Sequence, residues 1–146
     1  RAIYNDWATA TCPAEIPTSV SPVCDNTGKQ IVGAPKWTGI LGADYHTALA
    51  ATGLGLHAYL NAVGRTDQNL EAQLSQYGYQ PGYGLLEGGI GLTGEGEGKY
   101  EVSVIGKNIL DKQYTTSINN FSNSAPVGYD GIGARRYVGL ALKTSF

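Results

Sequence analysis

Apolar and polar residues alternate with a period of two along several stretches of the chain, which is the pattern of a β-strand with one apolar face. The clearest stretch is LGLHAYLNAVGR at residues 54–65. Its predicted apolar face has Leu54, Leu56, Ala58, Leu60 and Ala62, and its predicted polar face has Gly55, His57, Tyr59, Asn61 and Arg65. A helix rich in Ala and Leu is the alternative, but Gly53 and Gly55 would each cost about 1 kcal/mol inside a helix.

Five further stretches show strand patterns. They cover residues 2–9, 34–46, 83–93, 100–116 and 135–146. The connections alternate in length, with short turns at 50–53 and 94–99 (GEGEGK) and long loops at 11–33, 66–82 and 119–134. Outer-membrane barrels alternate in this way, with short turns on the periplasmic side and long loops outside.

The charged residues lie on the predicted strand faces that lack the larger apolar set. They include Asp44, Arg65, Glu87, Glu101 and Lys143. These side chains can point into a wet lumen, whereas a charge facing lipid at the bilayer midplane costs about 2–4 kcal/mol. The pattern therefore predicts an all-β fold of antiparallel, up-and-down transmembrane β-barrel strands, about six in number.

Composition agrees with strands and turns. Glycine accounts for 21 of the 146 residues, and tyrosine for 10, while charged residues make up only 15%. The net charge of −2 gives no electrostatic case for binding nucleic acid. The longest apolar stretch, residues 47–60, is too short for a spanning helix. Because the sequence begins with Arg1 and not with Met, we expect a piece of a longer or processed polypeptide.

Cys12 and Cys24 flank a proline-rich stretch, CPAEIPTSVSPVC. Two cysteines this close in a loop predict a disulfide and an oxidising compartment. A closed loop of this size would constrain the unfolded chain by roughly 3 kcal/mol. Zinc binding is the competing interpretation, but two sulfurs without a nearby histidine make a poor site.

Catalytic patterns are weak in this sequence. Its two histidines, His46 and His57, lie on different predicted strands, with no nucleophile in supporting context. The glycine-rich GLTGEGEGK does not match a phosphate-binding loop and precedes a strand. We therefore expect no enzymatic activity, no cofactor and no metal.

Three segments together resemble the C-terminal end of a TonB-dependent outer-membrane receptor. They are GAPKWTGILGADY, VSVIGKNILDKQY and RRYVGLALKTSF, in this order. The last one is similar to the C-terminal signal that the barrel assembly machinery reads. The residues that carry this similarity are Tyr137, Gly139, Leu140, Leu142 and Phe146.

The resemblance covers nearly the whole chain and implies that residues 1–146 are the last strands of a larger barrel. Such receptors have about 22 strands and a plugged lumen. The plug, the N-terminal strands and the segment that binds the TonB complex would lie outside this sequence. The implied function is active transport of a scarce nutrient (an iron-siderophore, a cobalamin or an oligosaccharide) across the bacterial outer membrane. The implied partners are membrane lipid, the rest of the barrel and plug, the TonB complex and the assembly machinery.

Two groups of residues are candidates for ligand contact. Tyr77, Tyr79 and Tyr83 lie in the loop sequence QYGYQPGYG, where aromatic faces with hydroxyls can stack on sugars or chelates. The second group would line the lumen and consists of His57, Tyr59, Asn61 and Arg65. Simple loop packing and a solvated interior wall are the alternatives for the two groups.

Two other interpretations remain open. A β-rich fragment with open edges could pair with copies of itself as an extracellular filament or amyloid-like assembly without transport. A small soluble β-domain would stay monomeric without detergent.

Overall fold

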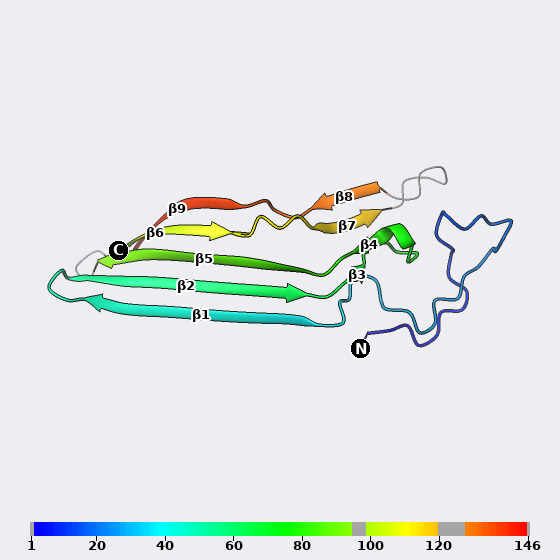
Figure 1. Ribbon diagram of the computed structural model, residues 1–146, viewed down its shortest axis with the longest axis horizontal. Coiled ribbons are helices and arrows are strands. Elements are labelled where there is room, and N and C mark those ends of the chain that lie inside the picture. The colour runs from blue at the N-terminus through cyan, green and yellow to red at the C-terminus, as the bar shows by residue number, and fades with distance from the viewer. Residues whose placement is uncertain (1, 95–98, 120–127, 146) are drawn as a thin grey trace. The chain divides into compact units, whose positions relative to one another are not determined.

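The computed structural model describes residues 2–94, 99–119 and 128–145, and the chain forms an all-β structure (Figure 1). Its residues divide into two compact units. The sheet unit consists of Gly39–Gly64, Gly84–Lys112 and Ala134–Phe146, and the loop unit consists of Arg1–Thr38, Arg65–Tyr83 and Gln113–Gly133.

Among the described residues, no helix has the length and apolar character needed to cross a membrane.

Five strands form the sheet unit. They are β1 (Thr38–Leu49), β2 (Leu54–Arg65), β5 (Tyr83–Gly94), β6 (Lys99–Lys107) and β9 (Tyr137–Ser145), hydrogen-bonded in the order β1-β2-β5-β6-β9. Successive strands run antiparallel, as Figure 1 shows for β1, β2 and β5. Within the described part of the chain, β1 and β9 are the two outer strands of this sheet. The prediction of antiparallel up-and-down strands is therefore confirmed.

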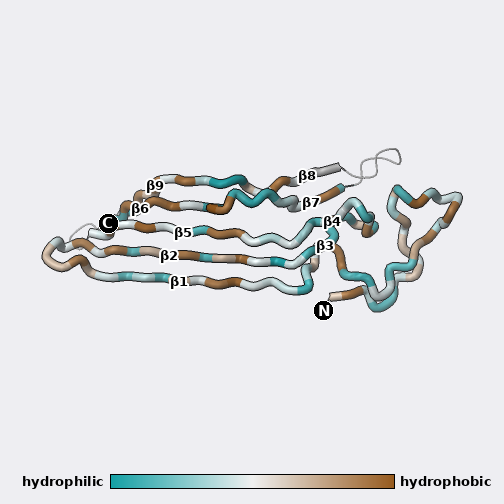
Figure 2. Tube along the Cα trace, viewed as in Figure 1, coloured by the Kyte–Doolittle hydropathy of each residue, from teal (hydrophilic) through white to brown (hydrophobic). Residues whose placement is uncertain are grey.

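The two faces of this sheet differ in chemistry. The register aligns Ile90 with Val104 and Val104 with Leu140, and the next row aligns Leu92, Val102 and Leu142. Because side chains alternate across a strand, these rows share one face. We call it the apolar face. Its side chains are exposed, with Leu140 at 78%. Figure 2 shows that the strands of the sheet unit carry both hydrophobic and hydrophilic segments.

The opposite face, which we call the polar face, holds the residues between those rows. One row of the register joins Thr93, Glu101 and Lys143. The polar face continues onto β2. A Cβ atom on Gly89, which would point to this face, would lie 2.7 Å from the Tyr59 ring, so the Tyr59 side chain is on the same face. The polar face also reaches β1, because a Cβ on Gly42 would lie 2.9 Å from Asn61 Oδ1. The charged residues Asp44, Glu87, Glu101 and Lys143 thus lie on the polar face, as predicted. Three apolar residues, Ile40, Leu85 and Ile105, share that face with them.

The described residues bury few apolar side chains. Ala10 and Ile118 are the buried hydrophobic side chains of the described residues. The largest fully buried side chains are polar, namely Glu71, Asn26 and Ser75. Burial of apolar area contributes roughly 25 cal/mol per Å² to folding, so this chain gains little from an internal core. Most of the apolar area that could still stabilise the protein by being covered lies on the apolar face of the sheet unit.

The β1–β2 turn forms where the sequence predicts it. The Thr52 backbone N–H and its hydroxyl both donate to the carbonyl of Leu49, at 3.3 and 2.9 Å. Gly53 adopts a positive φ of 65°, a conformation that glycine takes without steric cost. The other predicted short turn, at 94–99, falls mostly on residues 95–98, outside the described residues.

Residues 2–9 do not form the predicted strand. They take part in one isolated bridge, between Ile3 and Gln30, and a second bridge joins Ala10 to Cys24. The segment folds back on the cysteine loop: the Tyr4 N–H donates to the Lys29 carbonyl at 3.0 Å. Most of this segment has no neighbouring strand, so it cannot form the regular backbone hydrogen bonds of a sheet. Hydrogen-bonded turns form in their place.

The single strand predicted at 100–116 is also wrong, because the chain turns after β6. Asn108 and Asp111 have left-handed φ values of 47° and 50°, which Asn and Asp tolerate better than most residues. Asn108 holds the turn with its side chain, donating from Nδ2 to the carbonyls of Lys112 (2.9 Å) and Ala134 (2.8 Å). A separate strand, β7 (Thr115–Asn119), follows in the loop unit.

The long loops contain structure of their own. β3 (Gln68–Asn69) pairs with β4 (Tyr79–Gln80) around the 3-10 helix η1 (Gln76–Gly78), within the predicted loop 66–82. β7 pairs with β8 (Gly128–Ile132), so the predicted loop 119–134 is partly strand, while its residues 120–127 lie outside the described residues.

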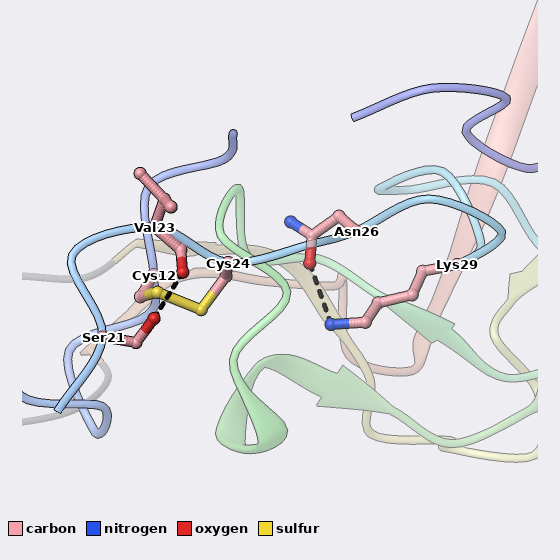
Figure 3. Close-up of a disulfide and its surroundings, with 6 residues drawn as sticks. All are labelled: Cys12, Ser21, Val23, Cys24, Asn26 and Lys29. Carbon is pink, nitrogen blue, oxygen red and sulfur yellow. Dashed lines mark hydrogen bonds between the residues drawn. A yellow bond between two sulfur atoms is a disulfide. The ribbon is translucent and has the colours of Figure 1, made fainter. Parts of the chain in front are cut away.

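The cysteine loop closes on itself. The sulfurs of Cys12 and Cys24 lie 2.07 Å apart, in the disulfide that the spacing predicts (Figure 3). The Ser21 hydroxyl donates to the Val23 carbonyl inside the loop, and Lys29 Nζ donates to Asn26 Oδ1 at 2.8 Å just beyond it.

Candidate functional site

The polar face brings together three of the four residues that the sequence predicts for the lumen. His57, Tyr59 and Asn61 follow each other on the polar side of β2. Asn61 Nδ2 donates to Glu87 Oε1 on β5 at 3.5 Å, and the rings of His57 and Tyr59 lie 5.9 Å apart. The fourth residue, Arg65, belongs to the loop unit.

Two histidines and an aspartate cluster at one place on this face. The rings of His46 and His57 stack with their centroids 4.2 Å apart and an interplanar angle of 6°. Asp44 bridges them: its Oδ1 lies 2.5 Å from His46 Nε2 and its Oδ2 lies 3.3 Å from His57 Nε2. We call Asp44, His46 and His57 the histidine cluster.

Glu101 on β6 reaches the far side of the cluster. Its Oε1 lies 3.3 Å from His57 Nδ1, although β5 runs between β2 and β6. A Cβ atom on Gly55 would contact Thr93, and one on Gly89 would contact Tyr59, so these residues lie opposite each other across β2 and β5. Residue 57 is midway between 55 and 59, and residue 91 is midway between 89 and 93. Gly91 therefore lies opposite His57. Because Gly91 has no side chain, the imidazole can cross β5 and meet Glu101.

Sequence reasoning missed this cluster because it treated the two histidines as separate. The signal was the hairpin itself: a turn at residues 50–53 places residue 46 opposite residue 57 across the two strands. The position of Asp44 beside His46 could be predicted from the same alternation, because residues 44 and 46 of a strand share a face.

The three candidate tyrosines all lie in the loop unit but in different settings. Tyr77 and Tyr79 are about half exposed, at 51% and 52%. The Tyr79 hydroxyl donates to the Asp67 carboxylate. Tyr83 stacks on Tyr114, with centroids 4.6 Å apart, so its ring is already engaged. The structure therefore leaves Tyr77 and Tyr79 as the more accessible aromatic faces.

Two carboxylates, Glu71 (buried) and Glu15 (half-buried), hold the loop around Tyr77 and Tyr79. Glu71 Oε2 accepts from the backbone N–H groups of Gln73 (2.8 Å) and Ser75 (3.0 Å). Glu15, from the cysteine loop, accepts from the Ser75 hydroxyl at 3.0 Å and from the Gln76 N–H at 2.9 Å. Hydrogen bonds to a charged acceptor are stronger than neutral ones, so they fix the two loops to each other.

The predicted assembly-signal residues lie on β9, apart from Phe146, which falls outside the described residues. Leu140 and Leu142 are on the apolar face, at 78% and 72% exposure. Gly139 is on the other face, where a Cβ would lie within 3 Å of the Tyr137 ring. Their role as a signal stays a prediction.

Comparisons of the chain with protein families, with curated proteins and with solved structures find no match.

The bond between Tyr79 and Asp67 gives a testable pH dependence. It raises the pKa of the Tyr79 hydroxyl above its ordinary value and lowers the pKa of the Asp67 carboxyl below its own. The stabilisation is thus lost as pH rises through the raised tyrosine pKa, or falls through the lowered aspartate pKa. Asp67→Asn is expected to return the Tyr79 pKa to about 10. The measurement is a ¹³C NMR titration of labelled tyrosines, assigned with Tyr79→Phe. Asp25→Asn is the matched control and should leave the Tyr79 titration unchanged.

Proposed function

We propose that the sheet unit forms part of the wall of an outer-membrane β-barrel, within a transport receptor for a scarce nutrient. The observation that carries this proposal is the exposed apolar face opposite a polar face that holds acids, amides and imidazoles. An aqueous protein rarely leaves rows of Leu, Ile and Val in contact with water over several strands. A lipid-facing barrel wall requires this arrangement, because lipid covers the outside and water fills the lumen.

The two outer strands of the sheet need further strands beside them if the sheet is part of a barrel wall. Lipid does not tolerate unpaired backbone N–H and C=O groups, each of which costs several kcal/mol. β1 and β9, the outer strands of the described sheet, therefore need neighbouring strands. We propose that the remainder of a barrel supplies them.

Transport of a siderophore, a cobalamin or an oligosaccharide is the finer part of the proposal. It rests on the three segments similar to TonB-dependent receptors and on the groups available for contact. Tyr59 and Asn61 on the polar face and Tyr77 in the loop unit offer aromatic rings and hydrogen-bonding groups. Aromatic faces with polar tips suit ligands that are flat or rich in hydroxyls.

Spin labelling tests the placement in lipid. Single nitroxide labels at residues 138–143, in a barrel that contains this chain and is reconstituted into phospholipid vesicles, report accessibility to dissolved oxygen and to an aqueous nickel complex. We expect a period of two, with labels at 138, 140 and 142 favouring oxygen and labels at 139, 141 and 143 favouring the nickel complex. Greater aqueous access at 140 and 142 than at 141 and 143 would contradict the membrane proposal.

Uptake assays test the transport part in cells that produce the receptor. Tyr77→Ala is expected to reduce uptake of one of three supplied compounds (an iron-siderophore, a cobalamin or an oligosaccharide) by up to roughly tenfold, since one aromatic contact is worth about 0.5–1.5 kcal/mol. Tyr45→Ala, on the apolar face, is the matched control. If both variants take up all three compounds at the same rate as the original protein, the proposed ligand classes are wrong.

Self-assembly is the second candidate function, and the same free edges support it. Open edges are templates for pairing with other chains. In that case the protein would form fibres with a meridional reflection near about 4.8 Å, and it would do so without lipid. Fibre diffraction on protein incubated without detergent separates the two proposals.

A further inference from the structure

We propose that the histidine cluster binds one first-row divalent metal ion, through Asp44, His46 and His57, with Glu101 positioning His57. Such a site would bind metal whether or not the protein transports a nutrient, because its three ligands are side chains of one sheet.

The ligand atoms are close enough for a common ion. One atom from each of the three residues lies within 4.8 Å of the others. In a tetrahedral site with metal–ligand distances of about 2.0–2.1 Å, neighbouring ligand atoms are about 3.4 Å apart. Asp44 Oδ2 and His57 Nε2 are already 3.3 Å apart. The His46 and His57 rings stack at 6°, so their nitrogen lone pairs run parallel, and one ring must turn for both to face one ion. The His46 side chain, 68% exposed, is the one with room to turn, and the Asp44 side chain is 57% exposed.

The donor set selects the class of metal. Two imidazole nitrogens and one carboxylate oxygen suit Zn²⁺ and its first-row neighbours, whereas Ca²⁺ and Mg²⁺ prefer sites built from oxygen. Three protein ligands leave at least one coordination position for water or a solute. The cluster therefore fits an open zinc-type site better than a closed structural one.

A metal-binding histidine commonly donates a hydrogen bond to a carboxylate from the ring nitrogen that does not bind the metal. Glu101 is placed to be that carboxylate for His57. When Nδ1 of His57 carries the proton, it donates to Glu101 Oε1, 3.3 Å away. The lone pair of Nε2 is then free on the side of Asp44. A carboxylate behind a ligating imidazole fixes the tautomer and raises the basicity of the ligand, and its loss typically costs 10–100-fold in affinity. His57 is the least exposed member, at 20%, and is held most firmly.

The fold fixes this arrangement through two features of the backbone. The short β1–β2 turn places His46 opposite His57, and Gly91 leaves the space through which His57 meets Glu101. The two imidazoles and the bridging carboxylate thus come from two adjacent, hydrogen-bonded strands. Sites held by strands are more precise than sites held by loops.

Zinc titration tests the proposal without any variant. The chain contains two histidines, so the proton NMR signals of their rings form two sets. Zn²⁺ added to the tag-free 146-residue chain in detergent micelles, under non-reducing conditions, is expected to shift both sets and to saturate at one ion per chain by calorimetry. Ca²⁺ and Mg²⁺ are expected to shift neither. Unchanged signals, or a shift of only one histidine, would overturn the proposal.

Variants identify the ligands. His46→Ala and Asp44→Asn alter exposed side chains and are expected to weaken Zn²⁺ binding at least tenfold, and Glu101→Gln by about 10–100-fold. Glu87→Gln changes an exposed carboxylate on the same face but outside the cluster. It is the matched control and should bind zinc as the original chain does. A Cys12→Ser/Cys24→Ser double variant must also retain binding. Binding that survives His46→Ala, or that disappears with the cysteines, would place the ion elsewhere and refute the site.

Discussion

Leu140→Lys is expected to prevent stable insertion of the barrel that contains this chain into phospholipid bilayers, whereas Ala141→Lys is expected to insert nearly as well as the original barrel. Residue 140 is 78% exposed and lies in the row with Ile90 and Val104 on the apolar face. A lysine facing lipid near the midplane costs about 2–4 kcal/mol. Ala141 pairs with Ser103 on the polar face, where an added charge stays in water.

The measurement is denaturant-dependent folding into vesicles, followed by tryptophan fluorescence. A loss of about 2–4 kcal/mol for Leu140→Lys and less than about 1 kcal/mol for Ala141→Lys is the expected pattern, given the depth dependence of such costs. Because the two positions are adjacent, they share depth and strand, and they differ only in the face they occupy. Equal losses at both positions would mean that the apolar face does not contact lipid.

The two faces of the sheet could be predicted from sequence because they depend on one simple geometric rule. A strand exposes alternate residues to opposite sides, so Leu54 and Leu56 separate from His57 and Tyr59 whatever the neighbouring strands are. The turn at 50–53 was equally accessible, because Gly53 supplies the positive φ that ends β1 and begins β2. Local chemistry decides both features.

The features that sequence reasoning missed depend on contacts between distant segments. Residues 100–116 were predicted as one strand, but Asn108 turns the chain by bonding to the Ala134 carbonyl, 26 residues away. The Glu15 carboxylate likewise orders the loop at Ser75 and Gln76, about 60 residues further along. Local propensity cannot reveal such bonds, because the partner's position depends on the completed fold.

The candidate site shows the same division. That His57, Tyr59 and Asn61 share a face followed from their spacing. The meeting of His46 with His57 required the hairpin register, and the contact of His57 with Glu101 required knowing which residue of β5 lies between them. Charged residues on a common face are therefore easier to predict than the particular groups that touch.

Glycines on the polar face explain how large side chains fit there, and they give the last prediction. Gly91→Val is expected to destabilise the sheet, although valine favours strands. A Cβ at residue 91 would lie 2.5 Å from Ser103 Cβ and 3.0 Å from Ser103 Cα, so the β6 backbone must move. Overpacking of this kind typically costs about 1–3 kcal/mol, which exceeds the roughly 1 kcal/mol span of strand propensities. The new side chain would also block the path of His57 to Glu101.

Urea unfolding in detergent micelles measures the effect, with Gly39→Val as the matched control. A Cβ on Gly39 would meet nothing within 4 Å, so valine there should gain strand propensity without strain. The expected result is a lower unfolding midpoint for Gly91→Val and an unchanged or higher one for Gly39→Val. If both variants unfold at the midpoint of the original chain, β5 and β6 are not as closely apposed at Gly91 and Ser103 as the structure has them. The reach of His57 across β5 would then need another explanation, since it depends on the same absent side chain.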